Sequence, residues 1–534
     1  MEIIKDFQEK ELPKIIPRDI QIPLEIPINR AITIIGPRRA GKTYVMYQVI
    51  LELLKKVKKE QILYVNLEKS GLGVATSKDL YLLLETFYEL YPQNKKINTC
   101  LLTTMIAVYA LPSLAEEVTK PAVPTTLMEA IMLGKPMTNF RLRYENVDQE
   151  GKSEQANAWT MRSLIGWQTK PLNNFSIAAQ LINVAQFNHD FYDGTNTTFG
   201  GATPADKKNY PLVVDPDYTG VNQLFLEWTG LPDTKVRVGR QSIKLDNVRF
   251  VGNVEYRQIM QVFDGIAVEN KSIKDVEIYA AHFEGLRRIT SEFFSNGHVD
   301  IAHATWKYSP TENLTGYGYF QDMPRNGFTY PSTGAAFTNN SSQTFGLRAD
   351  GSHKIAADWK MLYTAEYAKQ DNYRGGDHRI DAHYWRLGAG AGYGDWSARV
   401  DREVLSSNNG LYGFQTPLAT GHLFQGLGDS FLTTPKDGIE DTFITLNGKV
   451  LDVQLSAEYH WLDADRNFTA TGSAPNSNHY GKELDLVAGY SYDKNWSGKL
   501  EYFSFKEDDL YGTSTPSVRK RDTDKFMATM MYTF

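Results

Sequence analysis

The chain has 534 residues, a formal net charge of −6 at pH 7 and a single cysteine. This length exceeds what one hydrophobic core usually serves, which predicts two or more domains or one large closed sheet. The acidic balance excludes the basic surface that a nucleic-acid partner requires, and one cysteine excludes an intramolecular disulfide. Because no run of 18 apolar residues occurs, a helical membrane bundle is excluded, whereas a β-barrel with alternating strands is not.

The first 96 residues carry an α/β pattern. A β-rich apolar run, Ala31–Ile35, leads directly into Gly-Pro-Arg-Arg-Ala-Gly-Lys-Thr at residues 36–43, a complete Walker A pattern. Apolar residues at helical spacing predict a helix over Tyr44–Lys59, and Ile62–Leu67 predicts a second buried strand. Strand, motif and helix occur in the order that a phosphate-binding loop requires.

The motif supplies four candidate nucleotide-binding residues. Its glycines let backbone N–H groups turn inward around phosphate, its lysine would neutralise the β and γ oxygens, and its threonine would ligate Mg²⁺. These residues are Gly36, Gly41, Lys42 and Thr43. The stretch resembles the archaeal-type P-loop ATPases, in which a GPRRAGKT loop is followed by a strand that ends in an acidic residue, here Glu68.

A second feature of the resembling ATPases is missing. In that family a Walker B strand ending in Asp-Glu follows a segment like Glu85–Pro92, whereas residues 97–115 contain no acidic residue. A P-loop enzyme needs that carboxylate for Mg²⁺ and needs further parallel strands to cover the first ones. We therefore expect no enzymatic activity, no metal site and no cofactor, with ATP and Mg²⁺ bound only if the fragment is functional. The alternative function is that of an ATP-binding P-loop fusion protein.

Residues 95–115 have the pattern of a secretory signal peptide. Two lysines open the segment, Leu101–Leu111 is apolar, and Ser113–Ala115 provides a small-x-small cleavage site. The alternative is a buried helix of the preceding domain. The pattern indicates a truncated ATPase fragment, residues 1–96, joined to a complete exported protein either by gene fusion or by an artefact of sequence assembly.

Short alternating segments replace helical periodicity from residue 138 onward. Leu451–Trp461 alternates without a break, as do Trp359–Tyr367 and His383–Ala391. Counting such segments predicts about 18 antiparallel strands, enough to leave an aqueous lumen. The predicted fold class is all-β, a transmembrane antiparallel β-barrel over 138–534, preceded by a periplasmic segment at 116–137 and by the small α/β P-loop fragment.

The last predicted strand, Phe526–Phe534, has apolar residues at alternate positions and an aromatic end. With Tyr532 and Phe534 it resembles the C-terminal signal that the bacterial barrel-assembly machinery recognises. The expected location is the bacterial outer membrane, in contact with lipid and lipopolysaccharide. The N-terminal fragment is expected in the cytoplasm or absent from the mature protein.

Strand alternation also predicts which side chains face the pore. If Phe140 and Leu142 face lipid, the charged residues between and beside them face the lumen, and charges of both signs are expected there. The predicted acidic wall residues are Glu145, Glu227, Glu366, Asp401, Glu458, Asp485 and Glu501, with Lys499 beside them. The pore-lining arginines that alternation predicts are Arg141, Arg143, Arg162, Arg237, Arg348, Arg386 and Arg399. Three more, Arg240, Arg249 and Arg257, are predicted to line the pore from the family motifs described next.

Two groups of motifs resemble the alginate-export family of outer-membrane porins. The first is Val238–Gln241, followed by Arg249–Gly252 and by Gln258–Gly265, and the second is Phe424–Phe431. The resemblance implies a monomeric barrel of about 18 strands that carries anionic or polar solutes. Because carboxylates accompany the arginines in this lumen, a polyuronate would meet repulsion as well as attraction. The predicted function is passive diffusion of small polar or anionic solutes, not necessarily alginate, and a barrel enzyme or adhesin is the competing hypothesis.

Three stretches rich in Gly, Asn, Thr and Pro are predicted as long extracellular loops, of which at least one folds inward to constrict the pore. They are Asp193–Tyr218, Arg325–Ser342 and Val404–Pro435. In the first loop, Asp215-Pro216-Asp217 offers ligands for Ca²⁺, although solvated loop carboxylates are the expected reading. His298, His303, His383 and His460 show no metal-ligand spacing.

Overall fold

The computed structural model describes residues 8, 42–66, 85–92, 100–104, 123–194, 203–324, 339–469, 476–508 and 522–534. The chain divides into two compact units, Met1–Ala122 and Val123–Phe534. No helix in these described ranges has the length and apolar character needed to cross a bilayer.

The first unit contains a small α/β layer. Helix α2 (Lys42–Leu53) packs Ile50 and Leu53 against the start of strand β1 (Ile62–Asn66). A helix and a strand lie where they were predicted, but the helix ends at Leu53 and not at Lys59. Strand β1 pairs in parallel with β2 (Cys100–Thr104). No strand was predicted at β2, and its sequence, Cys-Leu-Leu-Thr-Thr, carries no carboxylate for Mg²⁺.

Strand β2 lies where the predicted signal peptide begins. Its pairing with β1 makes these five residues part of the α/β sheet of the first unit. This agrees with the alternative that they belong to the preceding domain, although they form a strand and not the helix that this alternative expected. Residues 105–115, with the expected cleavage site, lie outside the described residues, so the signal peptide stays a prediction. Lys42 and Thr43 open helix α2, whereas Gly36 and Gly41 also lie outside the described residues.

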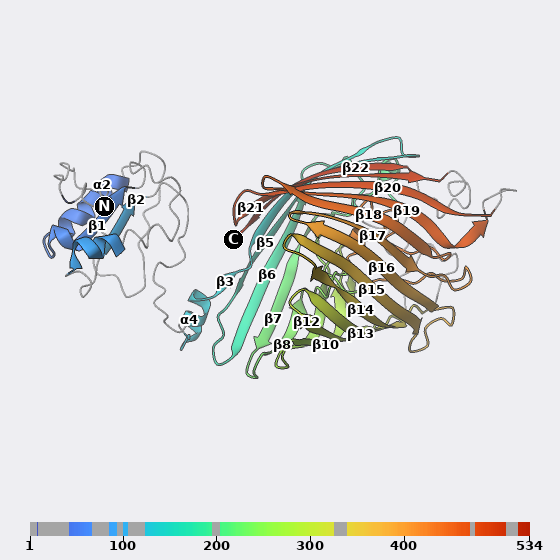
Figure 1. The fold of residues 1–534 in the computed structure, drawn as a ribbon, viewed down its shortest axis with the longest axis horizontal. Coiled ribbons are helices and arrows are strands. Elements are labelled where there is room, and N and C mark those ends of the chain that lie inside the picture. The colour runs from blue at the N-terminus through green and yellow to red at the C-terminus, as the bar shows by residue number, and fades with distance from the viewer. Residues whose placement is uncertain are drawn as a thin grey trace. The chain divides into compact units, whose positions relative to one another are not determined.

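The second unit is a closed β-barrel of eighteen strands with at least eight residues each, which confirms the predicted fold (Figure 1). The first nine are β4 (Asn139–Gln149), β5 (Ala156–Gln168), β6 (Phe175–Gln186), β7 (Tyr218–Trp228), β8 (Thr234–Gln241), β9 (Val262–Asn270), β10 (Val276–Arg287), β12 (His298–Ser309) and β13 (Glu312–Asp322). The other nine are β14 (Ser342–Lys354), β15 (Trp359–Asn372), β16 (Asp381–Tyr393), β17 (Trp396–Leu405), β18 (Ile439–Val450), β19 (Val453–Thr469), β20 (Asn476–Ser491), β21 (Trp496–Glu507) and β22 (Thr523–Thr533). Helix α4 (Leu127–Met132) and strand β3 (Lys135–Pro136) precede them, and the two-residue strand β11 (Phe293–Phe294) follows β10.

Consecutive strands pair antiparallel, and β22 pairs with β4 to close the ring in a register from Thr523↔Gln149 to Thr533↔Asn139. At the end of this seam Tyr532 packs against Trp496, and the Phe534 side chain is exposed. The two aromatic residues therefore lie at one rim of the barrel, beside its closing seam.

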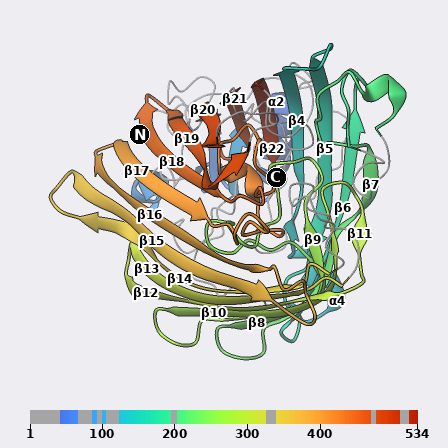
Figure 2. The same ribbon diagram turned by 90° about the vertical axis from the view of Figure 1, so that its right-hand side faces the viewer.

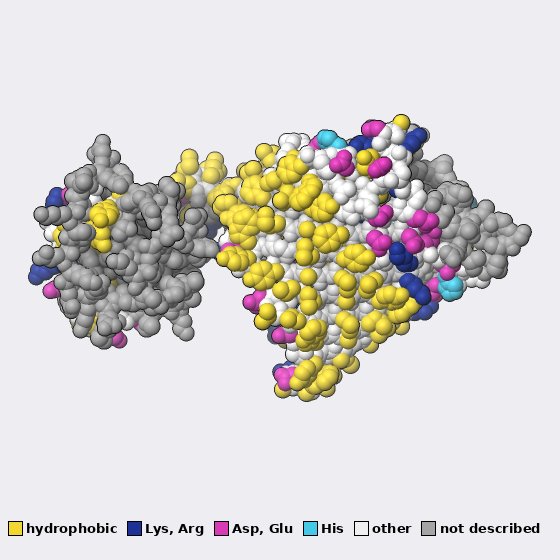
Figure 3. Space-filling view, turned by 90° about the horizontal axis from the view of Figure 1, so that it is seen from above, with side chains coloured by type: hydrophobic (Ala, Val, Ile, Leu, Met, Phe, Trp, Pro, Cys, Tyr) yellow, Lys and Arg dark blue, Asp and Glu magenta, His cyan; other side chains and the backbone are white. Residues whose placement is uncertain are grey.

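The outer wall is apolar (Figure 3). Along β6, for example, Ile177 and Leu181 are exposed while Ala178 and Ile182 are buried, because neighbouring side chains point to opposite faces. Exposed aromatic side chains gather beside the short turns, as in the aromatic girdles that meet a membrane interface. They are Trp167, Phe175, Trp306, Tyr308, Trp359, Tyr393, Trp396, Tyr490 and Trp496.

Long connections leave the other end of the barrel, and two of them turn back into the ring, where orange and green segments cross the interior in Figure 2. We call them the β8–β9 loop (residues 242–261) and the β17–β18 loop (residues 406–438). Their inner residues, among them Phe250, Ile259 and Phe414, are almost fully buried. The predicted loop Val404–Pro435 includes the second of these, whereas the first was not predicted to constrict the pore.

Candidate functional site

The two inner loops bind each other inside the barrel. The backbone N–H of Gly252 donates to the carbonyl oxygen of Leu418 at 2.9 Å, and that of Thr420 donates to the carbonyl oxygen of Val248 at 3.0 Å. The Thr420 hydroxyl also accepts the N–H of Val254 at 3.1 Å. These crossed contacts join the loops into one plug.

Aromatic packing fixes the plug to the wall. The ring of Phe250, in the β8–β9 loop, lies with its centroid 5.0 Å from Tyr317 and 5.3 Å from Tyr384, which belong to β13 and β16. Phe414 of the β17–β18 loop packs on Phe250 and also on Tyr384. Such edge and offset contacts add to the apolar area that is removed from water.

An ion pair also joins the β8–β9 loop to the wall. Arg249 lies 2.9 Å from Glu403 of β17, and both side chains are at most 2% exposed. The Arg249 guanidinium also donates to the amide oxygen of Gln425 at 3.1 Å and lies over the ring of Phe424. Because both charges are desolvated, each depends on its partner.

A second ion-pair cluster involves the β17–β18 loop. Asp429 lies 3.1 Å from Arg257 of the β8–β9 loop and 3.0 Å from Lys525 of β22. Arg257 also pairs with Glu145 of β4 at 2.9 Å. His422, in the same loop as Asp429, lies with Nδ1 2.9 Å from that carboxylate and donates its Nδ1–H to it. The cluster therefore connects both loops to the closing seam of the barrel.

Charge holds this cluster together over a wide pH range. Burial alone would raise the pKa of Asp429, but Lys525, His422 and Arg257 together hold it well below the ordinary value of 3.8. The carboxylate thus stays ionised at any pH near neutral. A carboxyl group with a depressed folded pKa contributes its full stability above the unfolded pKa and loses it as the pH falls through the folded value.

We therefore expect Asp429→Asn to lower the free energy of unfolding at neutral pH by about 3 kcal/mol, because it leaves buried cations without their counter-charge. The difference between the two proteins should be constant from pH 8 to about pH 5 and shrink only at lower pH. Urea unfolding of the barrel in detergent, followed by tryptophan fluorescence at several pH values, measures it. A difference that already shrinks near neutral pH would contradict the assignment.

Five of the predicted pore-lining arginines lie on the inner side, but the plug covers them. Arg249 and Arg257 belong to the loop itself. Arg141 donates to the carbonyl oxygen of Glu255 at 2.6 Å and to the Gln258 side chain at 2.9 Å. The remaining two, Arg143 and Arg162, are at most 3% exposed, and the other three members of this covered group are at most 6% exposed.

Arg141 and Arg143 contact the β8–β9 loop from the wall, and none of the five covered arginines is free to meet a solute. Asp215 is also fully buried and accepts the N–H of Gln258 at 2.8 Å. The prediction that this carboxylate is a solvated loop group is therefore wrong, and it does not belong to an open Ca²⁺ site either. Its partner is the backbone of the β8–β9 loop.

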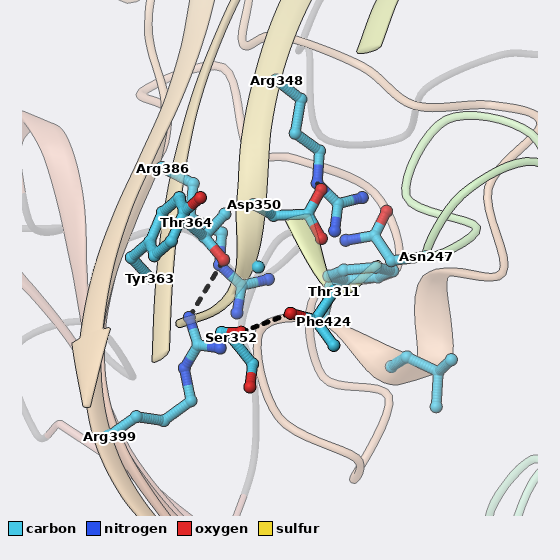
Figure 4. Close-up of a pocket in the computed structure, with 12 residues that line it drawn as sticks. Asn247, Thr311, Arg348, Asp350, Ser352, Tyr363, Thr364, Arg386, Arg399 and Phe424 are labelled. Carbon is cyan, nitrogen blue, oxygen red and sulfur yellow. Dashed lines mark hydrogen bonds and ion pairs between the residues drawn. The ribbon is translucent and has the colours of Figure 1, made fainter. Parts of the chain in front are cut away.

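Beside the plug lies a cavity of about 470 Å³. Figure 4 shows the guanidinium groups of Arg348, Arg386 and Arg399, from strands β14, β16 and β17, pointing into it. Asn247 and Phe424 of the two inner loops line it as well. A second cavity of about 210 Å³ shares Arg386, Arg399 and Phe424 with the first, so the two adjoin.

Positive charge dominates the larger cavity. Its lining includes three arginines and one carboxylate, Asp350, which lies 3.1 Å from Arg348. Arg386 pairs with Asp401 at 3.0 Å, and Arg399 pairs with the same carboxylate and donates to Thr364 at 3.2 Å. Guanidinium groups remain charged at any working pH and match carboxylates bidentately. The cavity is therefore suited to an anion.

The last two predicted arginines lie apart from this cavity. Arg237 faces the lumen and pairs with Glu227 across β7 and β8 at 2.7 Å. Arg240 does not line the pore: it pairs with Asp264 at 2.7 Å and stands opposite Leu224, whose side chain is exposed on the outer wall. Three positions separate it from Arg237, and an odd separation places two strand residues on opposite faces.

Residues 137–524 match the family model described as alginate export, and residues 28–102 match one described as an AAA domain. No protein with a curated description matches the chain in sequence. Among solved structures, OccK9 (OpdG) of Pseudomonas aeruginosa aligns with a TM-score of 0.55 at 11% identity, over 76% of this chain and 98% of that one. OpdK of the same organism, solved with vanillate, aligns with a TM-score of 0.53 at 12% identity, over 74% and 97% of the two chains. OccAB4 of Acinetobacter baumannii aligns with a TM-score of 0.54 at 10% identity, over 74% and 96%.

Proposed function

The chain belongs to the alginate export family, its barrel is an outer-membrane channel for passive diffusion, and we propose that this channel selects small organic anions. The observation that carries the proposal is the cavity with three arginines beside the plug. The cavity lies between the plug and the wall, so we infer that a solute crossing the barrel passes these guanidinium groups. Oriented charge in a narrow lumen is what gives a passive channel its selectivity.

The size of the cavity favours small solutes over a polymer. Its volume of about 470 Å³ lies within the range of sites that take one small molecule, roughly 300–1,000 Å³. The Arg249–Glu403 pair and the Asp429 cluster hold the plug on two sides of the ring. A polysaccharide chain would have to displace both anchors, whereas a small carboxylate would not.

The lining also suits an anion with an aromatic or apolar body. Phe424 and Tyr363 present ring surfaces next to the guanidinium groups, and Thr364 supplies a hydroxyl. Such a mixture of apolar faces and a few polar groups is typical of small-molecule sites. A related barrel, OpdK, holds vanillate, an aromatic carboxylate, and this supports the same solute class here.

In a planar bilayer with a KCl gradient, we expect a reversal potential that shows preference for chloride over potassium. Small aromatic carboxylates added to one side should lower the chloride current, because they compete for the same guanidinium groups. A neutral sugar of similar size is the control and should leave the current unchanged. Cation preference, or equal effects of the two solutes, would contradict the proposal.

The other expectations remain parts of the proposal. We infer that the barrel works as a monomer and that Tyr532 and Phe534 form the signal read by the assembly machinery. We also infer that the first unit hydrolyses no ATP and needs no nucleotide, because β2 carries no carboxylate. We infer as well that this first unit either lies in the cytoplasm or is removed from the mature protein.

A further inference from the structure

We propose that the inner wall of the barrel holds one divalent transition-metal ion, ligated by Glu458, His460 and Asp485. Glu458 and His460 are two residues apart on β19 and therefore share a face, and Asp485 of β20 stands directly opposite Glu458. One ligand atom from each residue lies within 4.8 Å of the others. The spacing rules of sequence motifs miss such a set because it is assembled across two strands.

The distances fit a metal better than hydrogen bonds. His460 Nε2 lies 3.4 Å from Glu458 Oε2 and 3.4 Å from Asp485 Oδ2. Ligands on a tetrahedral ion with bonds of about 2.1 Å are separated by about 3.4 Å. A hydrogen bond from a ring N–H to a carboxylate is shorter, roughly 2.7–2.9 Å.

Unpartnered polar atoms point independently to a ligand. His460 is 2% exposed, yet its Nε2 has no hydrogen-bond partner among the described residues. Asp485 Oδ1 and Glu483 Oε2, next to it on β20, are likewise buried and without such a partner. A buried polar group without a partner costs about 1–3 kcal/mol, so three together require an explanation.

The surroundings of the histidine complete the pattern. Its other nitrogen, Nδ1, lies 3.0 Å from both carboxylate oxygens of Asp441 on β18. A carboxylate at that position accepts a hydrogen bond from Nδ1–H, which fixes the proton on Nδ1 and leaves the lone pair of Nε2 for a metal. The Thr445 hydroxyl in turn donates a hydrogen bond to Glu458 Oε1 at 3.1 Å, which fixes that carboxylate.

Charge favours a cation at the same point. Four carboxylates meet here, those of Asp441, Glu458, Glu483 and Asp485, and in the described part of the chain no lysine or arginine lies within ion-pair distance of them. One imidazole with carboxylates suits Zn²⁺ or Mn²⁺ more than Ca²⁺, which prefers oxygen ligands alone. The adjoining cavity of about 210 Å³, which Glu458 and His460 line, gives the ion an access route and room for a water ligand.

The ion would also stabilise the plug. Asp485 Oδ2 accepts the backbone N–H of Leu427 at 3.0 Å, and Glu483 accepts that of Gly428, so the β17–β18 loop already binds carboxylates of this cluster. A metal on Asp485 fixes the carboxylate that holds the loop. The inference stands apart from the choice of solute, because metal binding is measured without transport.

The test uses the full chain extracted from outer membranes without chelator. Elemental analysis should find one equivalent of Zn²⁺ or Mn²⁺ per chain, and after chelation Zn²⁺ titrated calorimetrically should bind again and raise the unfolding temperature. His460→Gln should weaken that binding by tenfold or more, on the order of what a lost metal-site contact costs. His303→Gln is the matched control, because His303 is also buried and pairs with a carboxylate, Asp246, at 2.8 Å.

Absence of metal in the native protein, together with no binding of added Zn²⁺ or Mn²⁺, would overturn the proposal and identify His460 as an imidazolium shared among carboxylates. Binding that survives His460→Gln would place the ion elsewhere and overturn it as well. If that variant does not fold, Asp485→Asn provides the same comparison. The measurements on the unmodified chain decide the question in either case.

Discussion

Replacing Arg386 and Arg399 together with glutamine will turn an anion-preferring channel into one that favours cations. Both guanidinium groups pair with Asp401, whose side chain is fully buried. Without them, the one arginine that still lines the cavity, Arg348, is paired with Asp350, and Asp401 behind the lining is left without a counter-charge, so the local charge changes sign. At about 4 Å a unit charge is worth about 1 kcal/mol even in bulk water, so two lost charges should change the anion-to-cation permeability ratio on the order of tenfold or more.

Reversal potentials under a salt gradient measure this ratio. Arg402→Gln is the matched control, because Arg402 lies on the same strand as Arg399 but stands opposite Leu387, an exposed residue of the outer wall. The control should keep the selectivity of the unmodified channel. An unchanged ratio in the double variant would show that the solute passes elsewhere.

Replacing Arg249 with methionine will release the plug. It leaves Glu403 buried and unpaired, a change that costs about 3–5 kcal/mol in comparable buried pairs. Part of this cost should be avoided by detachment of the β8–β9 loop from the wall, which would let Glu403 meet water. We therefore expect single-channel recordings with larger and more variable conductance, together with reduced stability against urea.

Removing the second charge of the pair tests whether the unpaired charge of Glu403 is what releases the plug. Glu403→Gln combined with Arg249→Met removes both charges, so the double variant should recover much of the stability and the steady conductance that the single variant loses. Removing Arg402, which is exposed, and its half-buried partner Glu440 should matter little, since ion pairs at the surface contribute about 0–1 kcal/mol. Equal instability in the single and double variants would mean that packing, not charge, holds the plug.

The barrel could be predicted from sequence because its signal is local. Alternation with period two depends only on neighbouring residues, and it recurs in each of the eighteen long strands. The same rule explains the one misplaced arginine. Arg240 was assigned to the pore from a family motif, although its odd separation from Arg237 already places it on the outer face.

The plug could not be predicted in the same way, because its contacts join distant parts of the chain. Arg257 meets Glu145 across 112 positions, and Arg249 meets Gln425 across 176. Arginines that alternation assigns to the lumen can therefore bind a solute or be covered by a loop, and sequence does not distinguish these outcomes. The loop covers Arg141, whereas Arg386 lines the cavity.

Closure of the ring between β4 and β22 imposes an order on folding. The Asn139 amide donates to the carbonyl oxygen of Tyr532 across 393 positions, whereas every other strand pairs with a neighbour in sequence. Bringing ends so far apart together costs about 5 kcal/mol of loop-closure entropy, against about 2 kcal/mol for a ten-residue hairpin. Hairpins can thus zip up early, while the final seam forms late and leaves two long edges unpaired until then. Those edges are the points at which the nascent barrel is most prone to aggregate, and a chaperone or an assembly template would have to cover them.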